Sequence, residues 1–181
     1  MGIRSIVVLA IDPGKTGGIC RYDTAAPAKA NTTFYQMPLD LNNDWDPWAM
    51  AMMVWSWKLN GVERVIIEQC HAFPGKQAFA SSVVMEAYGM WQGVLACQFT
   101  KDQVVVAPAN KWKKDMDLLV PVVKAGKKAT EKEKSLAYKA RKAKALEAAR
   151  KEFYPPFKTL RGRDLDGEAE AALLALWGSR L

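Results

Sequence analysis

Residues 3–12 read IRSIVVLAID, an almost unbroken aliphatic run that ends on an aspartate. Such a run is typical of a central strand with both faces buried, because a half-exposed strand alternates apolar and polar side chains. A second apolar run, residues 65–67, ends on Glu68 in the same way. Ligand-binding side chains stand at the carboxyl ends of strands in open α/β sheets. Asp12 and Glu68 are therefore predicted to meet if their strands are neighbours.

The rest of the chain predicts a sheet covered by helices. A turn-forming stretch at residues 13–18 precedes two short strand-like segments, residues 19–22 and 32–37, in the manner of antiparallel hairpins. Apolar spacing and chain breakers then predict a strand at 104–106 and helices at 48–59, 80–99, 135–153 and 167–177. A strand-rich opening followed by alternating strands and helices indicates an α/β fold, with one mixed sheet and helices on both faces.

The composition is that of one compact domain spanning residues 1–181. Half of the residues (50%) are hydrophobic and 25% are charged, which is ordinary for a chain with a single core. No apolar run approaches the roughly 18 residues that cross a bilayer, and no secretory leader is recognisable, so no membrane partner is expected. Three cysteines without a Cys-x-x-Cys pair exclude a disulfide framework and a four-thiolate zinc site. These features predict a reducing compartment. Because no Arg- and Ser-rich transit segment is recognisable at the N-terminus, the cytoplasm of a bacterium or of a phage-infected host cell is the expected location.

The positive charge is concentrated in one region. The net charge is +7, yet residues 111–151 hold 14 Lys or Arg and 5 Asp or Glu, a local balance of +9. A basic region of this kind favours a polyanionic partner such as nucleic acid. Its first part, at about residues 111–134, is predicted as a basic insertion that contains a loop around Pro121 and Gly126.

Two further acids stand at the start of the last predicted helix. Asp166 and Glu170 are four residues apart and lie on one helix face, whereas Glu168 points elsewhere. Helix capping accounts for one or two acids at a helix N-terminus, but it does not account for acids at the ends of apolar strands. Carboxylates without a histidine suit hard cations, so Mg²⁺ or Mn²⁺ is the expected metal. The expected ligands and catalytic residues are Asp12, Glu68, Asp166 and Glu170.

These elements, in this order, resemble the RuvC-like Holliday-junction resolvases of the ribonuclease-H-like superfamily, most closely the chloroplast branch of that group. The resemblance is carried by IDPG at residues 11–14, VIIEQ at 65–69 and EAALLALWG at 170–178. Between them lie GKQ at residues 75–77, the pattern YGxWxG at 88–93, and Pro108 followed by Trp112-Lys113. Together they cover nearly the whole chain, from residue 8 to residue 178.

The resemblance implies a metal-dependent endodeoxyribonuclease that serves DNA recombination and repair. Such an enzyme is a homodimer that makes paired symmetrical nicks in a four-way DNA junction, with two metal ions per active site and Asp12 bridging them. The sequence departs from the family at one point, since many relatives place the last two ligands three residues apart and some have histidine at the first. That spacing would use Gly167, which has no side chain to ligate a metal. Asp166 is therefore preferred, with Asp164 as the alternative.

Two glycines suggest where a second chain would pack. Gly89 and Gly93 are four residues apart on one face of the predicted helix 80–99, which permits close approach of another element. Nicking two opposed strands needs two active sites related by a two-fold axis, so this face is the expected dimer interface. A helix that packs inside a monomeric core is the alternative.

Candidate DNA contacts are polar groups near the acids and in the basic region. Lysine and arginine neutralise phosphates, and glutamine reads base edges. Any of them is equally compatible with a solvated loop, and a tryptophan is more typical of a core. The candidates are Lys15, Lys76, Gln77, Trp112, Lys113, Lys114, Lys127, Lys128, Arg161 and Arg163.

Other functions fit the sequence less well. GKT at residues 14–16 ends like a Walker A loop, but Leu9 stands where that loop needs glycine. The pattern DxGxT at residues 12–16 is also that of actin-like ATPases, whose second lobe has no room in 181 residues, so no nucleotide cofactor is expected. The sole histidine, His71, has no nucleophile positioned for it. Two alternatives stay open, a less selective branched-DNA nuclease and a non-catalytic junction- or RNA-binding protein.

Overall fold

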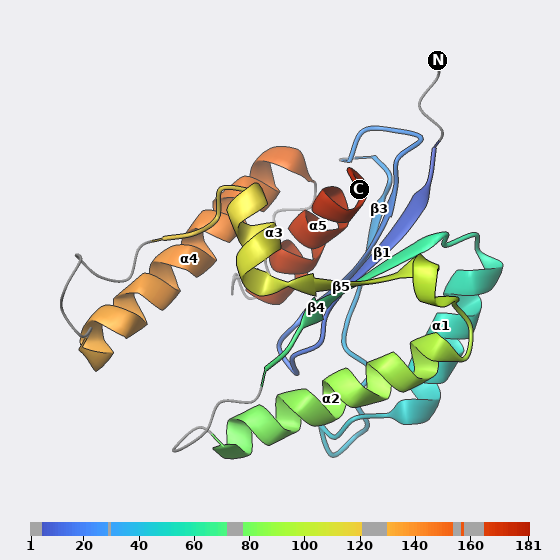
Figure 1. The fold of residues 1–181 in the computed structure, drawn as a ribbon, viewed down its shortest axis with the longest axis horizontal. Coiled ribbons are helices and arrows are strands. Elements are labelled where there is room, and N and C mark those ends of the chain that lie inside the picture. Colours follow the sequence, from blue (N-terminus) through green and yellow to red (C-terminus); the bar gives the residue numbers. More distant parts are fainter. Residues whose placement is uncertain (1–4, 29, 72–77, 121–129, 154–156, 158–164) are drawn as a thin grey trace.

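A mixed sheet lies between two layers of helices in the computed structural model (Figure 1), which describes residues 5–28, 30–71, 78–120, 130–153, 157 and 165–181. Its strands are β1 (Val7–Asp12), β2 (Gly18–Asp23), β3 (Thr32–Tyr35), β4 (Arg64–Gln69) and β5 (Val104–Pro108), in the spatial order β3-β2-β1-β4-β5. β1, β2 and β3 pair antiparallel, whereas β4 and β5 run parallel to β1. The predicted mixed α/β sheet with an antiparallel opening is confirmed.

Helices cover both faces of the sheet, as predicted. α1 (Pro47–Leu59) and α2 (Ala78–Ala96) lie on one face, and α3 (Ala109–Asp115), α4 (Glu131–Glu152) and α5 (Asp166–Gly178) lie on the other (Figure 1). The strands divide their side chains between two cores because successive residues point to opposite faces. In β1, Leu9 and Ile11 pack with α1 and α2, whereas Val8 and Ala10 pack with α4 and α5.

The element ends differ from the predicted ones in places. β1 begins at Val7, and α4 begins at residue 131 because Thr130 and Glu133 form a capping box ahead of the predicted start. The short α3 was not predicted. The first residues of the predicted insertion belong to α3 and its last ones to α4, while residues 121–129 lie outside the described part of the chain.

The last helix is the central element of its layer. Gly167 and residues 169–178 of α5 are all buried, as expected for a helix that is apolar on every side. Gly178 is the last residue of this helix, and a Cβ there would come within 2.3 Å of the Ile66 side chain. The glycine therefore lets α5 pack closely on β4. None of the helices in the described segments is long and apolar enough to cross a membrane.

Candidate active site

Asp12 and Glu68 stand side by side at the carboxyl ends of neighbouring parallel strands. Ile11 of β1 pairs with Ile67 of β4, so the next residue of each strand, Asp12 or Glu68, stands at the same level of the sheet. Both acids continue the alternating set that includes Ala10 and Ile66, and so point toward the α5 layer. They line one pocket of about 230 Å³. The predicted meeting of the two strand-end acids is confirmed.

The last helix brings a third acid into the same pocket. Glu170 lies on α5 with its side chain only 8% exposed, and it lines the pocket together with Asp12 and Glu68. Asp166, one turn earlier, is 41% exposed and is not among the pocket-lining residues. Glu168 points away toward β2, where its charge acts on the buried Cys20 thiol. Of the four predicted ligands, three therefore converge and the fourth stands at the edge.

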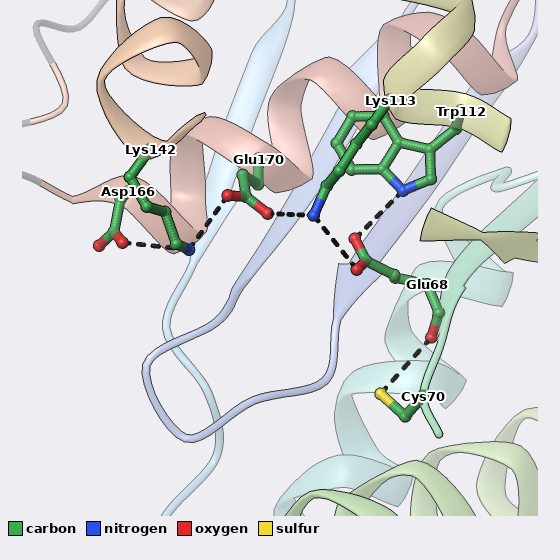
Figure 2. A network of polar contacts seen from close by, with 7 residues as sticks. All are labelled: Glu68, Cys70, Trp112, Lys113, Lys142, Asp166 and Glu170. Carbon is green, nitrogen blue, oxygen red and sulfur yellow. Dashed lines mark hydrogen bonds and ion pairs between the residues drawn. The ribbon is translucent and has the colours of Figure 1, made fainter. Parts of the chain in front are cut away.

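Two lysines join the acids into one network (Figure 2). Lys113 Nζ of α3 lies 3.3 Å from Glu68 Oε1 and 2.8 Å from Glu170 Oε2. Lys142 Nζ of α4 lies 3.1 Å from Glu170 Oε1 and 3.1 Å from Asp166 Oδ2. Glu170 is thus held by an ammonium group on each side. Asp166 is tied to the buried acids through Lys142.

Trp112 belongs to the core beneath the site. Its side chain is fully buried, and its indole N–H donates to Glu68 Oε2 at 3.1 Å (Figure 2). The assignment of Trp112 as a DNA contact is therefore wrong, because a buried ring offers no face for a base to stack on. Its role in the structure is to hold one oxygen of Glu68 while Lys113 binds the other.

The network changes the acidity of its members. Burial, together with the charges of Glu68 and Glu170, raises the pKa of Asp12 from 3.8 to about 7. Burial also raises the pKa of Glu68, although Lys113 opposes the change. Burial acts against ionisation of Glu170 as well, but Lys113 and Lys142 outweigh it and hold the pKa of that carboxyl below its ordinary value. The site therefore combines one firmly ionised acid with two that resist ionisation.

The donor set fits a hard divalent cation. As the side chains lie, no group of three or more metal-ligating residues in the described part of the chain is arranged to hold an ion. Lys113 and Lys142 stand between the carboxylates and supply the positive charge that these largely buried groups need. Oxygen donors of this kind suit Mg²⁺ or Mn²⁺, and the residues that would hold such ions are Asp12, Glu68, Asp166 and Glu170.

The other predicted contacts are dispersed. Lys15 pairs with Asp44 at 3.3 Å, and Lys114 is exposed on α3. Lys113 lies inside the acidic network rather than on the open surface. The remaining candidates, together with the alternative ligand Asp164, lie outside the described residues: Lys76, Gln77, Lys127, Lys128, Arg161 and Arg163.

One helix face that the sequence analysis did not single out lines the pocket. Tyr138, Arg141, Lys142 and Ala145 of α4 all border it. Their spacing of three, four and seven residues from Tyr138 is that of one helix face. This periodicity was available in the sequence. It could not be interpreted without knowing that this face packs over the acids.

Comparison with known proteins rests on the fold. No family model matches the chain, and no curated protein matches its sequence. Among solved structures, T. thermophilus RuvC in complex with a Holliday junction substrate matches with a TM-score of 0.52 and 14% identity, over 96% of this chain and 93% of that chain. The chain has the ribonuclease-H-like fold. The predicted fold class is thus confirmed, and the ribonuclease-H-like sheet presents Asp12 and Glu68 on its two central parallel strands.

Proposed function

We propose that this protein is a Holliday-junction resolvase, a metal-dependent endonuclease that makes paired symmetrical nicks in four-way DNA junctions. The observation that carries the proposal is the convergence of Asp12, Glu68 and Glu170 in one pocket. The convergence occurs on a fold shared with a RuvC protein whose structure contains a Holliday junction. Likeness to the chloroplast branch rests on the sequence elements alone.

In this proposal the acids hold the cations, and the surrounding residues orient the acids and balance their charge. Divalent cations, when bound, supply activation of a water molecule and stabilisation of the leaving 3′ oxygen. Trp112 orients Glu68 by donating to one of its oxygens. Lys113 and Lys142 neutralise Glu170 until a cation takes their place. Lys113 and Lys142 therefore stabilise the cluster of acids before metal and DNA bind.

The basic surface and an open helix face support the proposed partners. α4 carries much of the positive charge of residues 111–151 and borders the pocket, so an incoming DNA backbone would meet cations beside the acids. On α2, Gly89 and Gly93 are exposed, and a Cβ at either would meet nothing within 4 Å. The face they occupy is thus not packed against the described part of the chain. It is available to the two-fold mate that paired nicking requires.

Nicking of synthetic DNA tests the proposal. A four-way junction, a linear duplex and a single strand are incubated with Mg²⁺, with Mn²⁺ or with chelator, using wild type, Asp12→Asn and Glu170→Gln. We expect paired symmetrical nicks in the junction only. These nicks are lost with chelator and in both variants, while junction binding persists. The exposed Asp102→Asn, in the short 3₁₀ segment Lys101–Gln103, is the matched acid-to-amide control and should cut as wild type does.

The remaining outcomes separate the alternatives. Cutting of several branched forms with similar rates would indicate a less selective nuclease. Tight junction or RNA binding without cuts under any metal would indicate a binding protein, which needs the basic surface but not the acids. Cutting at wild-type rate by Asp12→Asn would refute the assigned site.

A further inference from the structure

Arg141 is the one cation of the acidic pocket for which the described structure shows no partner. Its side chain lines the pocket with Asp12, Glu68 and Glu170, and its Nε is buried without a hydrogen-bond acceptor among the described residues. The pocket's two lysines are differently placed, since each binds two carboxylates. Arg141 therefore carries a positive charge that the resting network does not use.

A buried donor without an acceptor is costly, and native structures rarely leave one. Glu68 and Glu170 are already engaged by ammonium groups, and no hydrogen bond or ion pair joins Arg141 to Asp12 among the described residues. An acceptor from outside the chain is therefore the natural partner. Guanidinium presents several N–H donors in one plane, a geometry that matches the oxygens of a phosphate. Arg141 also shares its helix face with Lys142, which directly contacts Glu170. A phosphate held by Arg141 would lie beside the acids.

We propose that Arg141 is a positioning residue that binds a non-bridging oxygen of a DNA phosphodiester at the mouth of the carboxylate pocket. This inference rests on the proposed function and adds the group that holds the phosphate. The metal-holding acids repel a phosphate, so a separate cation is needed to keep the phosphodiester close to them. Arg141 supplies that cation without withdrawing a lysine from the acids.

Binding affinities of two proteins for two junctions, compared as in a double-mutant cycle, test this proposal without depending on cleavage. Affinity is measured in chelator for wild type and Arg141→Ala, with an all-phosphate four-way junction and with one that carries neutral methylphosphonates at the exchange point. The neutral linkages should weaken wild-type binding by about tenfold, the loss expected for one charge-assisted hydrogen bond. They should leave binding by Arg141→Ala unchanged. Thermal unfolding confirms that each variant is folded.

Single-turnover cleavage at saturating enzyme gives the second measurement. Arg141→Ala should cut bound junction about tenfold to a hundredfold more slowly. Arg141→Lys keeps the charge but loses the planar fork, and should recover part of the rate. Lys139→Ala removes a positive charge from an exposed position on the same helix, outside the pocket lining, and should leave the single-turnover rate unchanged.

The outcomes distinguish this proposal from the function on which it rests. If wild type binds and cuts the junction, but both proteins lose equal affinity with the neutral linkages, the phosphate site is refuted and the proposed function stands. If Arg141→Ala cuts bound junction at the wild-type rate, the positioning role is refuted. If wild type does not bind the junction, both proposals are overturned.

Discussion

Gly17 and Gly167 pair as an isolated parallel bridge between the β1–β2 turn and the first turn of α5. Neither position has room for a side chain. A Cβ at Gly17 would lie 2.0 Å from the Asp12 carbonyl oxygen, and one at Gly167 would lie 2.1 Å from the Thr16 carbonyl oxygen. This backbone contact sets the start of α5 against the strand that carries Asp12. It also explains why the residue three positions before Glu170 is a glycine and not a ligand.

Gly167→Ala is expected to destabilise the protein and displace the acids of α5. Overpacking of a tight site costs about 1–3 kcal/mol, so the midpoint of thermal unfolding should fall clearly. Junction nicking should fall with it. Gly14→Ala, in the same turn as Gly17, is the control because its Cβ would meet no atom closer than 3.6 Å. Equal stability of the two variants would contradict a tight fit at residue 167.

Asp12 is expected to make the metal-free protein less stable as the pH rises. Burial and the neighbouring acids raise its pKa from 3.8 to about 7, so the folded state keeps a proton that the unfolded chain releases. Stability should therefore fall from about pH 4 to about pH 7 and then level off. Asp12→Asn should show a shallower fall, with Glu68 contributing its own part in both proteins. Urea unfolding in chelator measures the free energy of unfolding of both proteins at each pH. Parallel profiles for wild type and Asp12→Asn would show that Asp12 does not cause the fall in stability.

The sequence predicts the strand-end acids well because the signal is local. An apolar run that stops at Asp12 or Glu68 needs no knowledge of the rest of the chain, and the parallel register then brings the two together. The sequence does not predict that Lys142 and Arg141 line the pocket. α4 is basic along its whole length, and only the docking of one face over the acids selects these two. The seven-residue α3 is too short to show a helical period, so the burial of Trp112 was left open.

Trp112→Phe should lower stability by removing the indole N–H that binds Glu68. Leaving the buried Glu68 oxygen without this donor costs about 1–3 kcal/mol, which adds to the effect of the smaller ring. Trp91→Phe is the matched control, because Trp91 is equally buried and its N–H has no hydrogen-bond partner in the described part of the chain. Chemical unfolding of both variants should show the larger loss at Trp112. A loss at Trp91 of the same size would mean that the bond to Glu68 contributes little.

Lys113→Met should make the protein depend more strongly on divalent cations. Without the ammonium group, Glu68 and Glu170 lose the charge that separates them, so the metal-free variant should unfold at a lower temperature. Added Mg²⁺ should then raise its unfolding temperature more than that of wild type, since no ammonium competes for the carboxylates. Lys114→Met, exposed on the same helix, is the control. An equal Mg²⁺ effect in all three proteins would place the ion away from these acids.

Gly93→Leu should convert a dimer into a folded monomer. The open face around Gly89 and Gly93 suits close approach of a second helix, and a leucine there would hold the two chains apart. Helix stability should not suffer, because leucine favours the helix more than glycine does by roughly 0.5–1 kcal/mol.

Sedimentation should therefore give twice the 20.1 kDa chain mass for wild type and the single mass for Gly93→Leu. Gln92→Leu adds the same side chain a little over a quarter of a turn away from Gly93 on the exposed surface of α2, and should stay dimeric. A wild-type protein that is monomeric at every concentration, or a Gly93→Leu protein that remains dimeric, would remove α2 as the interface.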